Sequence, residues 1–345
     1  MDLDRRKMKI LSAIVSEYIR TGEPVGSKRV AQLLDTQISP ATCRNEMSSL
    51  FDLGLLEQPH TSAGRVPSHL GFRVYLDQML TCAPLTEAEK DSIDALFNVR
   101  NPDPDRLLAD AAEALARFTG CATVSATRPP KYVTVRRIEL IPLGAHVVMI
   151  VVVASNGVIK NKAYRLDMLC TPEILDFFNK FANDRFADRS IDEISTGYLH
   201  SIAVALGEYS QVFTPLLAGI FELCRQIRDG QFYTQGGTNL LGYPEFRQSA
   251  HDLLTLLENR ALLQDVLEGP ETRALNIKVG KENHLAQLEN STVLVARYNV
   301  GQDSSGVIGV IGPVRMDYSR LIPHLEYFAK MLGNLLSDTM NPKEE

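Results

Sequence analysis

Hydrophobic residues recur every three or four positions at the start of the chain, which is the spacing of amphipathic helices. Residues 3–21 predict a first helix, which Gly22 ends. A second helix is expected to begin at Ser27, a residue type that caps helix N-termini. A third follows the cap residue Ser39 and Pro40, which suits the first helical position. Its hydrophobic residues form one stripe, at Cys43, Met47 and Leu50. The spacing therefore predicts three consecutive helices.

After the third helix the pattern changes to that of a short hairpin. Gly54-Leu55-Leu56-Glu57 begins a strand, a polar turn follows, and Val66-Pro67 returns toward the core. Gly64 in the turn is expected to take a positive φ. Ser68 then caps a further helix. The apolar positions of that helix include Leu70, Val74 and Leu80. Helices followed by a hairpin predict a winged helix-turn-helix over residues 1–80.

The side of the third helix opposite the hydrophobic stripe is polar. It carries Thr42, Arg44, Asn45, Ser48 and Ser49. Arginine can take guanine O6 and N7 in a fork and asparagine can take adenine N6 and N7, whereas hydroxyls more often hold phosphates. An ordinary surface helix would show more Glu/Lys pairs, but Glu46 is the only acid between positions 36 and 51. We therefore interpret this helix as a recognition helix, with Arg44 and Asn45 at base edges.

Further candidates for DNA contact surround this helix. Lys28 and Arg29 lie in the first turn of the second helix, where cations oppose the helix dipole and a bound phosphate would remove the conflict. Taken alone, a solvated basic pair is the simpler interpretation. The predicted wing carries His60, Thr61, Ser62 and Arg65. The predicted DNA-binding set is Lys28, Arg29, Ser39, Thr42, Arg44, Asn45, Ser48, Ser62 and Arg65.

Beyond residue 80, helical and strand-like spacing alternate. A Thr86-x-x-Glu89 capping box opens a new helix after a predicted domain boundary, and another helix follows residues 101–105. Strand-like segments are 121–126, 133–141, 145–155, 158–166, 274–279, 291–299 and 305–312. Residues 190–270 are mainly helical, and a last helix follows Asp317. This order predicts an α+β domain interrupted by a mainly helical insertion.

Composition and charge narrow the class of protein. The chain has 345 residues, too many for one ordinary core, and a net charge of −6. Residues 1–80 hold ten Lys and Arg against nine Asp and Glu, so the predicted DNA-binding head is near neutral in an acidic chain. The longest apolar run, 147–154, is too short to span a membrane, and the N-terminus lacks a signal-peptide core. Five widely spaced cysteines suit reduced thiols in a cytoplasmic protein.

No sequence pattern supports catalysis, a metal or a cofactor. The seven histidines form no pair at i, i+4. The glycines of 306–312 spell G-x-x-G-x-x-G, not the dinucleotide-binding fingerprint, and Pro313 follows where a helix should begin. We therefore expect no enzyme, no metal site and no cofactor.

Three sequence runs resemble the heat-inducible transcription repressor HrcA family of bacteria. They are PATCRNEMSSLFDLGLLEQPHTSAGRVPSHLGFRVYLD (40–77), NLLGYPEF (239–246) and SGVIGVIGPVRMDYSR (305–320). The wing string PHTSAGRVPS is the most specific of them. Cys43 departs from the family, which usually carries a β-branched residue there. Because Cys43 lies on the inward stripe, this departure concerns packing more than DNA contact.

The resemblance implies a GAF-like domain at 84–188 and 273–340, split by an inserted dimerising domain at 189–272. It also implies a homodimer that binds an inverted-repeat operator in double-stranded DNA and represses chaperone operons. The chaperonin GroEL would keep the repressor active until misfolded protein occupies the chaperonin. No membrane partner is expected.

Two alternatives remain open from the sequence. The central domain could instead sense a small molecule, with the winged head as a protein-docking module, because winged helices sometimes bind proteins. The Gly242–Phe246 corner, rich in aromatics, is either a loop packed on its own domain or an interaction surface.

Overall fold

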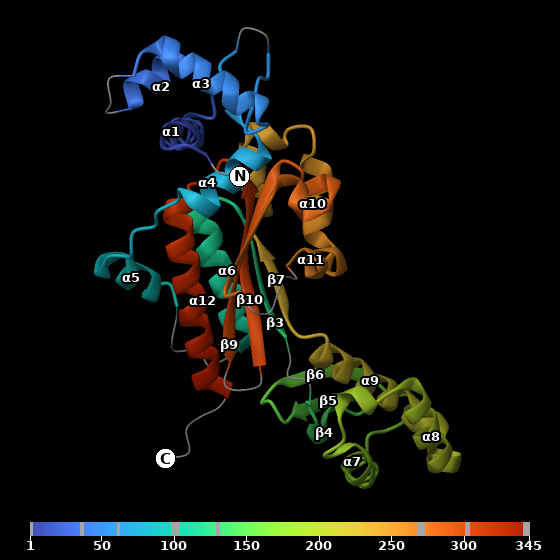
Figure 1. The fold of residues 1–345 in the computed structure, drawn as a ribbon. Helices are drawn as coiled ribbons and strands as arrows, with labels where there is room; N and C mark the ends of the chain where they lie inside the picture. The colour runs from blue at the N-terminus through green and yellow to red at the C-terminus, as the bar shows by residue number, and fades with distance from the viewer. Residues whose placement is uncertain are drawn as a thin grey trace.

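The computed structural model describes residues 3–34, 38–60, 63–97, 104–128, 132–267, 273–300 and 304–340. The chain forms an N-terminal head, a central body built on a five-stranded sheet, and a second α+β unit at the far end of the body (Figure 1). Among the described helices, none is both long enough and apolar enough to cross a membrane. The multi-domain α+β organisation predicted from the sequence is confirmed.

The head has the predicted winged helix-turn-helix order. Its elements are α1 (Arg5–Thr21), α2 (Ser27–Leu33), α3 (Pro40–Asp52), β1 (Leu56–Glu57), β2 (Val66–Pro67) and α4 (His69–Gln78). Ser39 caps α3 and Ser68 caps α4 through side-chain oxygens that accept backbone N–H bonds. The stripe of Cys43, Met47 and Leu50 is buried, as predicted. The short antiparallel strands β1 and β2 form the base of the wing.

Three local predictions in the head are wrong. Gly26, not Ser27, is the N-cap of α2, and no side chain caps this helix. Leu70 is 48% exposed and so does not belong to the core. Gly64 does not have a positive φ. The structure instead requires glycine there because a Cβ would lie 2.5 Å from the carbonyl carbon and oxygen of Val25.

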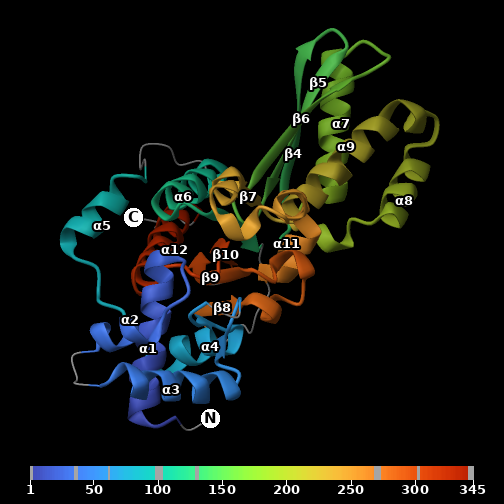
Figure 2. The same cartoon turned by 90° about the horizontal axis from the view of Figure 1, so that it is seen from above.

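The body is an antiparallel sheet with helices on both faces. Its strands, in the spatial order β7-β3-β10-β9-β8, are β7 (Phe232–Gln235), β3 (Ala122–Arg128), β10 (Ser304–Pro313), β9 (Ser291–Val300) and β8 (Leu275–Val279). One face is covered by α6 (Pro104–Thr119) and α12 (Tyr318–Met340), with α5 (Glu87–Asp94) beside them (Figure 2). The other side carries α10 (Ala250–Glu258) and α11 (Arg260–Leu267).

Short 3-10 turns connect these elements. In the body they are η3 (Gly237–Gly242), η4 (Pro244–Phe246), η5 (Gly280–Asn283) and η6 (Ala286–Leu288). The buried side chains of the head and the body form one connected hydrophobic cluster, which includes Ile14, Phe72 and Tyr318. The head is therefore packed onto the body and not tethered to it by a linker alone.

The second unit has its own sheet and its own core. Strands β4 (Val135–Gly144), β5 (Val147–Ala154) and β6 (Ile159–Arg165) lie in that order. The helical elements are α7 (Pro172–Phe186), η1 (Ile191–Glu193), α8 (Thr196–Leu206), η2 (Gly207–Tyr209) and α9 (Ser210–Arg228). Alternate residues of β5 are buried, and α9 approaches closely at Gly219, where a Cβ would lie 2.6 Å from Ile150. The core of this unit runs from Val133 to Ile227.

The division of the chain differs from the one predicted. The sequence placed the insertion at 189–272, whereas the segment with a separate core runs from Val133 to Ile227, between β3 and β7. The helices predicted over 190–270 belong to two different units of the structure. Helix α9 packs on β5 and β6, while α10 and α11 contribute to the core of the body. The strands predicted at 133–166 thus belong to the interrupting unit.

Candidate nucleic-acid interface

Helix α3 lies on the side of the head away from the body (Figures 1 and 2). The face of α3 opposite its buried stripe is polar and exposed. Arg44, Asn45 and Ser48 are exposed on it. Within the described ranges, neither Arg44 nor Asn45 has a side-chain hydrogen bond or an ion pair. Ser39 Oγ accepts a bond from Thr42 N at 3.1 Å, and the two hydroxyls lie 2.9 Å apart. The hydroxyls thus hold the start of the helix, while the arginine and the amide stay available.

Glu46, the acid nearest to Arg44 in this helix, is turned away from that face and neutralised, while the other acid of α3, Asp52, is exposed at the C-terminal end of the helix. Glu46 lies 3.1 Å from Lys7 Nζ and 3.7 Å from Arg6 Nη1, both on α1. Hydrogen bonds to Asp4 and Glu46 raise the pKa of Lys7. Because these cations offset the Glu46 carboxylate, the neighbouring acid does not cancel the positive charge of Arg44.

The two cations at the start of α2 have different surroundings. Arg29 Nε lies 2.9 Å from Glu17 Oε1 on α1, and Arg20 Nη2 lies 2.7 Å from the same oxygen. The hydrogen bonds from Arg20 and Arg29 lower the pKa of Glu17 to about 2. Lys28 is exposed and, in the part of the head that the structure describes, has no ion pair. Arg29 therefore ties α2 to α1, and Lys28 is the freer cation.

The wing brings Arg65 back beside α3. The guanidinium of Arg65 lies 4.8 Å from the centre of the Phe51 ring, in the last turn of α3. The backbone of Arg65 forms an antiparallel bridge with Val25, next to the start of α2. His60 is exposed at the wing tip, and the predicted contacts Thr61 and Ser62 lie outside the described residues. Arg65 therefore links the wing to α3 through its side chain and to the start of α2 through its backbone.

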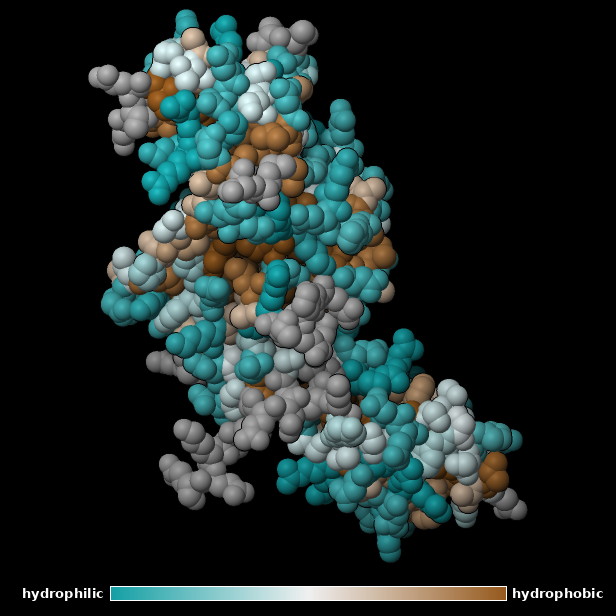
Figure 3. Space-filling view, viewed as in Figure 1, coloured by the Kyte–Doolittle hydropathy of each residue, from teal (hydrophilic) through white to brown (hydrophobic). Residues whose placement is uncertain are grey.

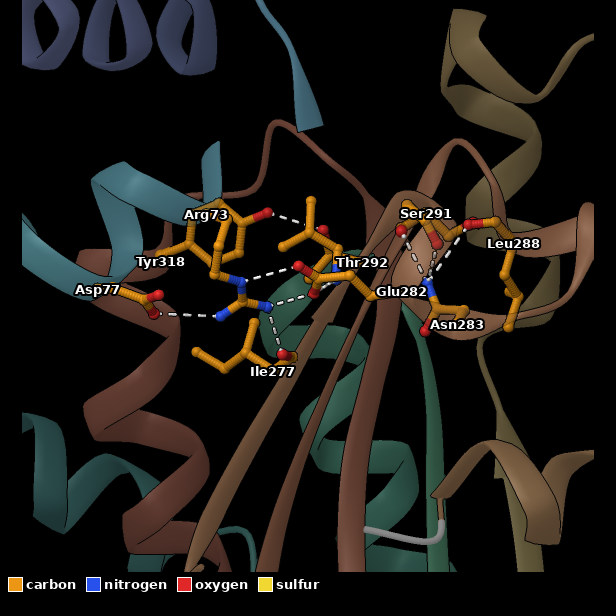
Figure 4. Close-up of polar contacts among 11 residues, drawn as sticks. Arg73, Asp77, Ile277, Glu282, Asn283, Leu288, Ser291, Thr292 and Tyr318 are labelled. Atoms are coloured by element: carbon orange, nitrogen blue, oxygen red, sulfur yellow. Dashed lines mark hydrogen bonds and ion pairs between the residues drawn. The ribbon is translucent and has the colours of Figure 1, made fainter. Parts of the chain in front are cut away.

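The head is fixed on the body through Arg73 of α4 (Figure 4). Arg73 Nε donates to Glu282 Oε1 at 2.9 Å, and Nη2 donates to the other carboxylate oxygen and to Ile277 O at 2.7 Å. Burial disfavours the charged form of Glu282, yet the bonds from Arg73 hold its pKa below the usual range. A Cβ at Gly280 would lie 2.5 Å from the His69 ring, so the two parts meet closely. The orientation of α3 is thus set relative to the body.

A second contact joins the head to the aromatic corner of the body. Arg315, after β10, pairs with Glu245, and a Cβ at Gly22 would lie 3.3 Å from its guanidinium. Phe246 is buried, and the Tyr243 hydroxyl donates to Gly120 O at 3.3 Å. Burial raises the pKa of Tyr243 to about 12. These contacts support the interpretation of the corner as a loop packed on its own domain.

Sequence reasoning missed Phe51, Arg73 and Glu282. Phe51 carried a usable signal, because it follows Arg44 and Ser48 at the i, i+4, i+7 spacing of one helix face. The Arg73–Glu282 pair left no signal in the sequence, because its two members lie 209 residues apart.

Three helices, a hairpin wing and an exposed Arg/Asn face on the third helix define a winged helix-turn-helix DNA-binding head. Comparison with known families agrees. Residues 2–74 match the family model described as winged helix-turn-helix transcription repressor, HrcA DNA-binding. Residues 105–322 match the one described as HrcA protein C terminal domain.

Curated relatives extend the match along the chain. The heat-inducible transcription repressor HrcA of Thermoanaerobacter pseudethanolicus is 34% identical over 99% of both chains. That of Acetivibrio thermocellus is 32% identical over 95% of this chain and 94% of its own. A solved crystal structure of a hypothetical protein superposes with a TM-score of 0.69 at 24% identity, covering 98% of this chain and 100% of its own, and so shares the fold.

The chain belongs to the heat-inducible transcription repressor HrcA family. The resemblance drawn from the three sequence runs is confirmed. The relatives are named as transcription repressors, in agreement with the expectation of a non-enzymatic protein.

Proposed function

We propose that this protein is a dimeric repressor of chaperone operons that binds an inverted-repeat operator through its two winged heads. The observation that carries the proposal is the state of charge around Arg44 in the first half of α3. Glu46 is neutralised by Lys7 and Arg6, while Arg44 and Asn45 are exposed and have no partner in the described part of the chain. A face that offers an unpaired arginine and amide suits the major groove.

The predicted DNA-binding residues fall into two groups according to the chemistry of their side chains. Arg44 and Asn45 contact base edges, whereas Lys28, Arg29, Ser39, Thr42, Ser48, Ser62 and Arg65 position the head on phosphates or in the groove. Arg29 bonds Glu17 through Nε and is 46% exposed at its side chain, so its terminal nitrogens can still meet a phosphate. Ser39 and Thr42 act through the helix start that they hold.

Two heads are required for tight binding. The near-neutral head of an acidic chain gains little from bulk electrostatics, so one head alone binds weakly. A two-fold dimer presents matched heads to matched half-sites. The second unit supports self-association because it exposes apolar side chains, with Phe177 47%, Val204 67% and Tyr209 62% exposed. Figure 3 shows hydrophobic residues at the outer end of α8.

Selection of bound duplexes from a random pool by the full-length chain tests this proposal. We expect two inverted half-sites whose centres lie about one helical turn, or a multiple of it, apart. Recovery of a single half-site, or no enrichment of any sequence, would contradict a symmetric operator-binding dimer.

We also propose that GroEL modulates this activity, on the strength of the family resemblance. Adding GroEL should raise the fraction of protein able to bind the selected operator. Adding GroEL already loaded with an unfolded protein should not. Equal binding with free and loaded chaperonin would contradict the proposal.

The alternative of a small-molecule sensor has weaker support. A cavity of about 220 Å³ lies beside Phe118, Cys121, Tyr243 and Arg315. Ligand pockets usually measure roughly 300–1,000 Å³, so this one is small for a metabolite. A rise in melting temperature with one metabolite, measured without DNA, would favour sensing over the repressor proposal.

A further inference from the structure

The wing residue Arg65 is fixed at its backbone. Its N–H donates to Val25 O and its carbonyl accepts from Val25 N, both at 2.9 Å. The preceding residue, Gly64, touches the backbone of Val25 so closely that a Cβ would lie 2.5 Å from it. The Cα of Arg65 therefore has little freedom to move relative to the turn that precedes α2.

The side chain of Arg65 rests on an aromatic ring from the recognition helix. Phe51 lies 4.8 Å beneath the guanidinium and remains 41% exposed. It stands at the end of the stripe formed by Arg44 and Ser48. An arginine from the wing and the outward face of α3 are thus brought to one edge of the head.

The guanidinium is left with free donors. Nε of Arg65 is buried without a hydrogen-bond partner, whereas Nη1 and Nη2 are not fully buried and remain accessible to solvent. No carboxylate pairs with Arg65 in the described ranges. A guanidinium stacked on an aromatic face keeps its full charge and its in-plane N–H groups, which match the oxygens of a phosphate. The stacking thus fixes the position of the Arg65 guanidinium without neutralising its charge.

We propose that Phe51 is a positioning residue for DNA binding. Its ring holds the Arg65 guanidinium at the edge of α3, where Nη1 and Nη2 meet a backbone phosphate beside the groove that Arg44 reads. This inference rests on the proposed function, because it assigns a second part of the same DNA-binding face.

Salt titration of DNA binding by the full-length chain tests it. The variants are Phe51→Ala, Phe51→Tyr, Arg65→Ala and the double variant Phe51→Ala/Arg65→Ala, each with a random-sequence duplex and with the selected operator. Leu70→Ala, which removes another exposed apolar side chain of the head, is the matched control. Thermal unfolding of each variant confirms that it folds.

We expect Phe51→Ala to weaken binding to both duplexes by about five-fold per head, the size of an exposed cation–π contact. The slope of log affinity against log salt should flatten by about 0.9 for each phosphate that the variant no longer neutralises. Phe51→Tyr should retain wild-type binding, and the double variant should be no weaker than Arg65→Ala, because both changes remove the same contact.

Other results overturn the assignment. A wild-type salt slope in Phe51→Ala, or additive losses in the double variant, would show that Phe51 does not act through Arg65. A loss confined to one operator position would make Phe51 a direct base contact instead. A wild-type chain that binds neither duplex overturns the proposed function itself, which is a different result.

Discussion

The contact between Arg73 and Glu282 predicts how firmly the head is held on the body. Replacing Arg73 with methionine keeps most of the apolar stem but removes every N–H donor. The variant loses two bonds to the Glu282 carboxylate and one to Ile277 O. The head should then separate from the body more often, while its own fold persists.

The magnitude follows from the exposure of the pair. Hydrogen bonds to charged groups contribute roughly 1.5–3 kcal/mol each, and water replaces part of this where the groups are accessible. The Arg73 side chain is 25% exposed and that of Glu282 is 39% exposed. We therefore expect a total loss of about 2 kcal/mol in the free energy of opening, equivalent to about a thirty-fold rise in the open fraction.

Amide hydrogen exchange in α4 and β8 measures this opening. Asp77→Asn is the control, because Asp77 meets Arg73 at 3.3 Å with a side chain that is 57% exposed, and such exposed pairs contribute little. The pKa of Glu282 is lowered in the folded chain, so the contribution of its charge is present above the usual value of 4.5 and is lost as the pH falls. The difference between Arg73→Met and wild type should shrink accordingly. Equal exchange in wild type and Arg73→Met would refute this reasoning.

Further predictions concern the head itself. Lys28→Ala should weaken binding to operator and random duplexes alike and reduce the salt slope, as measured by titration; a loss for the operator alone would contradict a phosphate contact. Gly64→Ala should lower the melting temperature because its Cβ meets the Val25 carbonyl at 2.5 Å, whereas Gly26→Ala, with nothing within 4 Å, should not. Glu17→Gln should lower the melting temperature at neutral pH. The pKa of Glu17 falls from 4.5 to about 2 on folding, so the difference in melting temperature between Glu17→Gln and wild type should vanish as the pH drops through that interval. A difference that stays constant with pH would contradict the ion-pair explanation.

Much of the head was predictable because local signals agree there. The Ser39 cap, the buried stripe from Cys43 to Leu50 and the hairpin that follows all specify one local arrangement. The role of Gly64 was not predictable in the same way. Its requirement comes from the approach of Val25, which no local pattern in the turn records.

The boundaries of the second unit could not be predicted from the sequence, because they depend on tertiary packing. Helices α9 and α10 have similar amphipathic spacing, but α9 buries Ile220 against β5 and β6 while α10 buries Leu253 in the core of the body. Which sheet a helix covers is decided by the three-dimensional arrangement. The strand β7, only four residues long, lay in an aromatic-rich stretch without alternation and was not predicted.

The central claim is that Arg44 on α3 reads the operator. The most direct test compares the affinity of wild type and Arg44→Ala for the selected inverted repeat and for a scrambled duplex of equal length. We predict that Arg44→Ala loses about 1–3 kcal/mol on the operator for each half-site, and that a repeated selection tolerates any base at one position of each half-site. An unchanged preference for the operator over the scrambled duplex would contradict the assignment of α3 as the recognition helix.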